Sequence, residues 1–166
     1  MVIYVDPDDL RAIFEVVKDH FSSHESVPDF SLEKNGVEKL CGVLRGVQMD
    51  FYPTVIEKAA YLLVQISKGH FFSNGNKRVA LATTLFFIFY NDHDIAGKTK
   101  KDYQTKLREL FPNYDSFHDF NDFRPEEYGY YNLSIIIAER SDKHVSSFDE
   151  LKNKVLNFLE FSLIKN

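Results

Sequence analysis

The chain has 166 residues, of which 44% are hydrophobic, and this content supports a buried core and excludes an intrinsically disordered protein. Its formal net charge of −5 argues against general binding to nucleic acid through neutralisation of phosphates. Cys41 is the only cysteine, so no internal disulfide can form, and the acidic N-terminus lacks a signal-peptide pattern; both features favour a cytoplasmic protein.

The first part of the chain is predicted to form two helices and a connecting segment. Asp6 followed by Pro7 is typical of a helix start, and apolar residues then recur at helical spacing to about residue 20. A second helix is predicted after Ser31. Apolar and polar side chains then alternate, which indicates an extended segment or short hairpin near residues 46–52, with a plain connector as the alternative. This segment contains Val47, Gln48, Met49, Asp50 and Phe51.

The middle of the chain carries the most apolar helix. Pro53 is predicted to open a third helix that ends near Lys68, with Gly69 at the expected C-cap position. After a short loop, residues 79–90 are apolar almost throughout, so the fourth helix is predicted to be central and buried. This run is too short to cross a bilayer, which needs ~20 apolar residues, and no membrane partner is expected.

The last part of the chain is less regular. A charged amphipathic helix is predicted over residues 101–111, and an irregular loop over residues 113–131, which are rich in Asp, Phe and Tyr and contain Pro125. A further helix is predicted over residues 132–140. Ser147 and Glu150 form a capping-box pattern that introduces a final helix. The sequence therefore predicts an all-α helical bundle in one domain over residues 1–166.

Residues 70–78 read His-Phe-Phe-Ser-Asn-Gly-Asn-Lys-Arg and directly precede the buried helix. Helix N-termini favour phosphate because their first N–H groups and the helix dipole face the anion. His70 can accept a proton from a hydroxyl at neutral pH. The pattern indicates phosphoryl or nucleotidyl transfer, whereas a loop histidine beside two solvated cations is the alternative. The predicted phosphate-binding residues are Gly75, Asn76, Lys77 and Arg78.

The same residues resemble the signature of the Fic/Doc family, His-x-Phe-x-(Asp/Glu/Asn)-(Gly/Ala)-Asn-(Gly/Lys)-Arg. Lys77, where most Fic proteins carry Gly, resembles the Doc (death-on-curing) toxin branch. The resemblance extends over residues 6–95 and implies a Fic-like bundle in which residues 46–52 are a flap that binds the target peptide as an added strand. Residues 98–131 are not explained by the resemblance and are predicted to be an insertion.

The Doc branch implies a toxin of a toxin–antitoxin module. Such a toxin transfers phosphate from ATP to a Ser, Thr or Tyr hydroxyl of a protein target, such as a translation elongation factor, and is restrained by a separate antitoxin. AMP transfer is the first alternative, which Lys77 and Leu81 disfavour because Fic adenylyltransferases carry Gly and a second Arg there. Lys68 is predicted to add positive potential near the phosphates, or else to be a solvated helix end.

Asn74 departs from the pattern, because Fic proteins usually carry Asp or Glu at this position to bind Mg²⁺. Asn keeps one carbonyl oxygen but loses the negative charge, so Asn74 is a weak candidate for a metal ligand. A helix N-cap is its alternative role. Together with the unexplained insertion, Asn74 favours the second functional alternative, a catalytically silent binding protein with the Fic fold.

Overall fold

The computed structural model describes residues 1–21, 26–139 and 147–166, and it confirms the predicted all-α class. Two short 3₁₀ turns, η1 (Pro7–Asp9) and η2 (Phe30–Leu32), precede the first two helices. The helices of the described residues are α1 (Leu10–Phe21), α2 (Lys34–Gly46), α3 (Val55–Gly69), α4 (Asn76–Tyr90), α5 (Lys100–Leu110), α6 (Pro125–Ala138) and α8 (Phe148–Ser162). Two three-residue strands, β1 (His93–Ile95) and β2 (Leu163–Lys165), pair in antiparallel fashion with Ile95 opposite Leu163.

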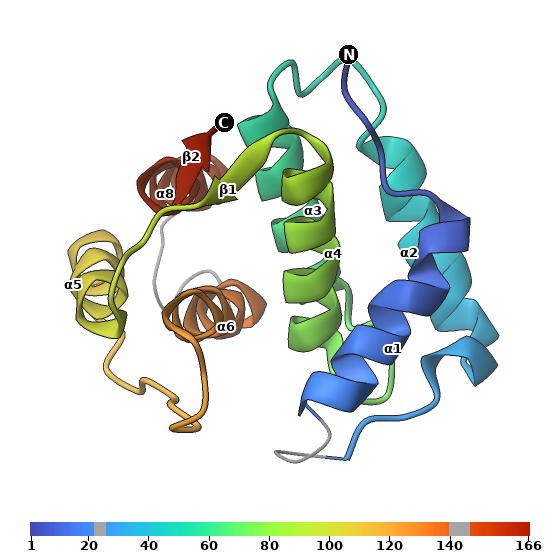
Figure 1. Cartoon of the computed structure of the whole chain (residues 1–166), viewed down its shortest axis with the longest axis horizontal. Coiled ribbons are helices and arrows are strands. Elements are labelled where there is room, and N and C mark those ends of the chain that lie inside the picture. The colour runs from blue at the N-terminus through green and yellow to red at the C-terminus, as the bar shows by residue number, and fades with distance from the viewer. Residues whose placement is uncertain (22–25, 140–146) are drawn as a thin grey trace.

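Helix α4 lies at the centre of the bundle. In Figure 1, α3 and α4 stand together in the middle, α1 and α2 lie on one side, and α5, α6 and α8 lie on the other. Helix α4 contacts α1, α3 and α6, which cover it on different faces. Most of its residues from Arg78 to Ile88 are buried, as the apolar run predicts. The loop that precedes α4 is therefore held at one end of a well-packed helix.

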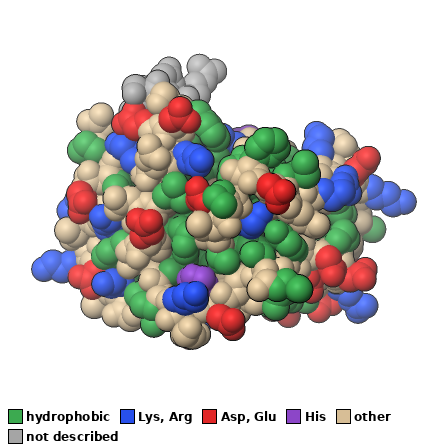
Figure 2. All heavy atoms as spheres, turned by 90° about the horizontal axis from the view of Figure 1, so that it is seen from above, with side chains coloured by type: hydrophobic (Ala, Val, Ile, Leu, Met, Phe, Trp, Pro, Cys, Tyr) green, Lys and Arg blue, Asp and Glu red, His purple; other side chains and the backbone are tan. Residues whose placement is uncertain are grey.

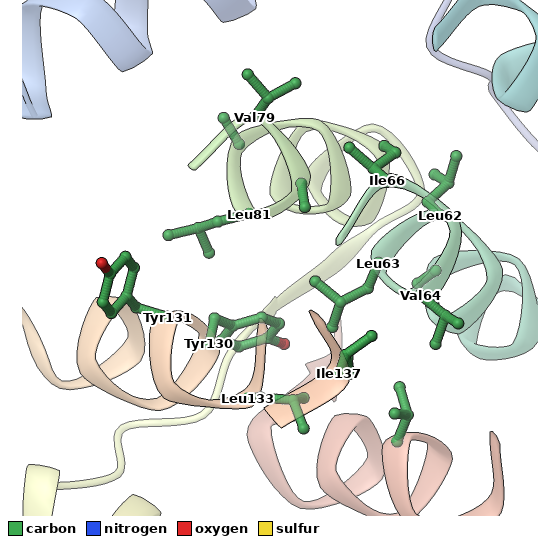
Figure 3. Close-up of a cluster of buried hydrophobic side chains, with 14 of the residues drawn as sticks. Leu62, Leu63, Val64, Ile66, Val79, Leu81, Tyr130, Tyr131, Leu133 and Ile137 are labelled. Carbon is green, nitrogen blue, oxygen red and sulfur yellow. The ribbon is translucent and has the colours of Figure 1, made fainter. Parts of the chain in front are cut away.

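The core between α3, α4 and α6 is drawn in Figure 3. Leu63 of α3 and Leu81 of α4 project toward the tyrosines of α6. Tyr130 is fully buried, its hydroxyl lies 2.8 Å from Ser162 Oγ, and burial raises the pKa of its phenol. Its neighbour Tyr131 lies toward α4. Helix α6 thus packs along the central helix, although the sequence predicts a loop over its first half.

The capping residues explain where most helices begin. Thr54 Oγ1 accepts the N–H of Glu57 at 3.1 Å, so α3 starts after Thr54 rather than at Pro53. Ser147 Oγ accepts the N–H of Glu150 at 3.1 Å, which confirms the predicted start of α8. The predicted cap at Ser31 is wrong, because Asp29 caps the turn η2 and α2 begins only at Lys34.

Pro125 has the opposite effect from the predicted one. It is the first residue of α6 rather than part of an irregular loop, because proline needs no hydrogen-bond partner at the first helical position. The Arg124 N–H donates to Glu127 Oε2 at 2.9 Å and closes this first turn. The helix predicted over residues 132–140 is the second half of α6, and residue 140 lies outside the described residues.

The end of α4 is tied to the N-terminal segment. Asn91 Oδ1 accepts the Ile3 N–H at 2.8 Å, and Asn91 Nδ2 donates to the Ile3 carbonyl at 2.7 Å. Strand β1 follows directly and pairs with β2. No helix within the described ranges combines the length and apolarity that crossing a bilayer requires. On the face drawn in Figure 2, acidic and basic side chains are interspersed among hydrophobic ones.

Candidate active site

The loop between α3 and α4 places His70 at the C-cap of α3. His70 has φ 46° and ψ 49°, the left-handed conformation, which is uncommon for a residue other than glycine and costs some backbone energy. This conformation ends α3 and turns the chain toward α4. The His70 side chain is exposed, so a hydroxyl group of another molecule can reach it.

The loop is held by its own side chains and by a buried ring. Asn76 Oδ1 accepts the Phe72 N–H at 2.9 Å, and Asn76 Nδ2 donates to the Phe72 carbonyl at 2.7 Å. The Phe72 ring is buried and packs edge-on against Phe30, with centroids 5.0 Å apart. The Ser73 N–H donates to Glu33 Oε2 at 2.8 Å. The Asn76 side chain therefore fixes the loop, and its backbone N–H lies at the start of α4.

Gly75 is the N-cap of α4 and needs to be glycine. Its φ is 77°, and a Cβ atom there would lie 2.8 Å from the Phe30 ring. The Gly75 N–H donates to Asn74 Oδ1 at 2.8 Å, and Asn74 Nδ2 donates to the Ser26 carbonyl at 2.7 Å. Asn74 therefore lies before the N-cap and does not occupy it.

A polar hollow of about 200 Å³ opens at this end of α4. It brings together most of the residues predicted for the site, along with two others. Its lining consists of His70, Ser73, Asn74, Gly75, Asn76, Lys77, Arg78 and Tyr131. Lys68 is absent from this lining, and its ammonium lies 6.0 Å from the centroid of the Phe148 ring. The hollow combines an exposed imidazole with two cations and a helix N-terminus, an arrangement suited to an anion.

Arg78 forms the buried wall of this hollow. Its side chain is only 1% exposed, and its guanidinium carbon lies 5.0 Å from the Tyr131 centroid and 5.7 Å from the Phe120 centroid. Burial lowers the pKa of Arg78, and its electrostatic interaction and hydrogen bond with Tyr131 partly offset this effect. An arginine with this environment remains protonated, because its ordinary pKa is far above neutrality. Because Arg78 is buried, the alternative interpretation of it as a solvated cation is wrong.

Besides Ser73, which lies within the motif, two residues at or near the hollow were not predicted from the sequence. Tyr131 falls in a stretch without helical periodicity, and only Pro125 could have indicated the helix that carries it. Glu33, which binds Ser73, lies 40 residues before it in the sequence and gives no local signal. Both act through contacts between distant segments.

Residues 46–52 form consecutive turns at the end of α2, which differs from the extended segment or hairpin that their alternation predicts. The Val47 N–H donates to the Val43 carbonyl at 3.0 Å, and the Met49 N–H to the Gly46 carbonyl at 3.2 Å. The ammonium of Lys58, only 4% exposed, donates to the carbonyls of Val47 at 2.8 Å and Met49 at 3.2 Å. Lys58 thus holds the segment in this bent form, while Phe51 is 80% exposed.

Replacing Lys58 with methionine is expected to loosen this segment and to destabilise the protein. The change keeps the apolar stem but leaves two carbonyls without their donor, at a cost of about 1–3 kcal/mol. Urea unfolding should show the lower stability, and hydrogen exchange should show faster opening of residues 47–50. Lys39→Met, at an exposed position of α2, is the control. Equal unfolding midpoints for the two variants would contradict this role of Lys58.

The residues around the hollow offer little to a metal ion. Within residues 1–21, 26–139 and 147–166, no three His, Cys, Asp or Glu side chains come together as metal ligands. Asn74 presents one neutral oxygen, which already accepts the Gly75 N–H. A Mg²⁺ ion there would take most of its remaining ligands from phosphate and water, as this ion commonly does.

Comparison with known proteins agrees with this geometry. The model of the Fic/DOC family matches residues 4–88, which include α1 to α3, the loop with His70 and most of α4. Toxin Doc of Mycolicibacterium smegmatis is 30% identical over 97 residues, a stretch that covers 58% of this chain and 71% of that toxin. No solved structure matches the chain. Helices α5, α6 and α8 follow the residues that the family model matches.

Proposed function

The chain belongs to the Fic/DOC family, and we propose on this premise that it is a Doc-like toxin that transfers phosphate from ATP to a hydroxyl of a protein target. The observation that carries the proposal is the polar hollow at the start of α4, where the exposed His70 stands beside Lys77 and Arg78. The similarity to Toxin Doc supports the toxin role. A separate antitoxin would be the natural partner of such a protein.

In this mechanism His70 accepts the proton of the target hydroxyl as that oxygen attacks phosphorus. The phosphate lies in the hollow, where the N–H groups at the start of α4 point toward its oxygens. Arg78 offers a planar fork to two of these oxygens and Lys77 a point charge, and both stabilise the negative charge that moves to the leaving group. Bound Mg²⁺ would add charge neutralisation on the ATP phosphates. The target backbone would lie along residues 46–52, where Met49 and Phe51 are exposed.

Transfer of AMP is the second candidate. Lys77 and Leu81 argue against it, because the latter is a buried apolar side chain that cannot bind a phosphate. Incubating the protein in bacterial lysate with Mg²⁺ and ATP labelled at either the γ- or the α-phosphate separates the two reactions. A target labelled only from the γ-phosphate is the expected result. Label from the α-phosphate would make the protein an adenylyltransferase, and no label beside an active control would favour the binding protein.

Replacing Asn74 with aspartate is expected to strengthen the dependence of transfer on Mg²⁺. The new carboxylate adds a negative charge at the mouth of the hollow and keeps an acceptor for the Gly75 N–H, which Asn74 now serves. The Mg²⁺ concentration for half-maximal transfer should fall roughly tenfold. Asn74→Ala, which removes the oxygen, should raise that concentration. Identical Mg²⁺ titrations for all three proteins would assign Asn74 to loop structure alone.

A further inference from the structure

Burial of the Arg78 guanidinium needs compensation. A charged side chain that is 1% exposed has lost most of its water, and desolvation of such a group is costly unless other groups replace that water. The Tyr131 ring lies 5.0 Å from the guanidinium carbon, within the range of a cation–π contact. Tyr131 also lines the hollow itself. Its side chain therefore contacts both Arg78 and the space that a phosphate would fill.

Tyr131 is itself firmly placed. Its ring packs edge-on against Phe120 and Phe123, with centroids 5.8 Å and 5.4 Å away. The next residue, Asn132, donates to the His118 carbonyl at 2.9 Å and accepts the His118 N–H at 2.8 Å. These bonds tie the segment before α6, which carries Phe120 and Phe123, to the helix that carries Tyr131.

We infer that Tyr131 is a positioning residue for the phosphate site, because it holds the Arg78 guanidinium in the orientation that a phosphate requires. This inference rests on the proposed function. It assigns a role to α6, which lies beyond residues 4–88 that match the family model. The predicted insertion then completes the hollow, since the residues before Tyr131 supply the rings that pack on it.

The test compares two substitutions of Tyr131 with one substitution of a buried ring outside the hollow. Tyr131→Leu removes the ring beside Arg78, and Tyr131→Phe removes only the hydroxyl. Phe111→Leu is the matched control: Phe111 is also buried, at 0% exposed against 7% for Tyr131, and its ring centroid lies 5.2 Å from the Lys154 ammonium, outside the residues that line the hollow. Thermal unfolding measures the stability of each variant. Calorimetric titration with ATP and Mg²⁺ measures affinity, and steady-state transfer gives KM and kcat.

Tyr131→Leu is expected to bind ATP about 5- to 30-fold more weakly, with a matching rise in KM for ATP. Phe111→Leu should lose similar thermal stability yet bind ATP within about twofold of wild type. Tyr131→Phe, which keeps the ring, should recover most of the affinity. ATP binding by Tyr131→Leu equal to wild type, or an equal loss in Phe111→Leu, would overturn the inference alone. A wild-type protein that binds no ATP would overturn the proposed function and the inference with it.

A second measurement tests the accessibility of the Arg78 guanidinium in the absence of nucleotide. Phenylglyoxal modifies accessible guanidinium groups, and mass spectrometry can follow the reaction at Arg78. We expect at least fivefold faster modification in Tyr131→Leu than in wild type, and no such change in Phe111→Leu. Equal rates in the two variants would show that the ring of Tyr131 does not shield or orient Arg78.

Discussion

Replacing His70 with alanine is expected to lower phosphate transfer by about 10²–10⁴-fold, the usual contribution of a general base. Affinity for ATP should change little, because in the proposed mechanism the N-terminus of α4 and its cations bind the phosphate and the imidazole does not. The same variant should no longer be toxic when expressed without an antitoxin. Labelling of the target in lysate and growth after induction are the two measurements.

Two controls accompany this variant. His93→Ala removes an imidazole on β1, whose Nδ1 bonds the Asn91 carbonyl at 2.7 Å, and should leave transfer unchanged. His70→Asn retains a side chain that tolerates the left-handed backbone, so its loss of transfer would reflect the missing base and not a distorted loop. A fully toxic His70→Ala would remove His70 from the mechanism.

Replacing Arg78 with glutamine is expected to weaken ATP binding by about 10- to 100-fold, which corresponds to the ~1.5–3 kcal/mol of hydrogen bonds to a charged group. The charge and the planar fork both disappear, and the side chain becomes shorter. Lys77→Gln should weaken binding less, because Lys77 is half-buried and offers a single point charge. Calorimetry with ATP and Mg²⁺ measures both variants.

Stability must be followed in parallel, because Arg78 contributes to packing as well. Its guanidinium lies against two rings, so Arg78→Gln should also lower the melting temperature. Arg78→Lys restores the charge without the fork and separates the two contributions. Unchanged ATP affinity in a folded Arg78→Gln would show that this arginine supports the bundle and takes no part in phosphate binding.

The sequence predicts the part of the site that is continuous along the chain. The apolar run of α4 and the loop before it carry strong local patterns. The structure places His70, Gly75 and Arg78 around one hollow. Tyr131 could not be predicted, because its contact with Arg78 joins residues 53 positions apart and leaves no periodic signal. The same holds for the pairing of β1 with β2.

Local sequence patterns gave wrong predictions of secondary structure where contacts with other parts of the chain determine the backbone conformation. The alternation of residues 47–51 favours a strand, but the buried ammonium of Lys58 takes two of their carbonyls and keeps the segment bent. Pro125 resembles a loop residue until its position at the start of α6 is known. In both cases the outcome depends on partners that the segment itself does not contain.

The hollow is formed by two segments that lie far apart in the sequence, the loop with His70 and helix α6, and this separation affects folding kinetics. Helices α3 and α4 and the loop between them are neighbours in sequence, so the loop with His70 can form early from local contacts. Tyr131 contacts Arg78 only after α6 packs against α4, and this packing closes a much longer loop of the chain. A refolding experiment should therefore show protection of α4 amides before ATP binding appears. If the proposed function holds, newly made molecules would pass through an interval in which His70 is in place but ATP cannot yet bind.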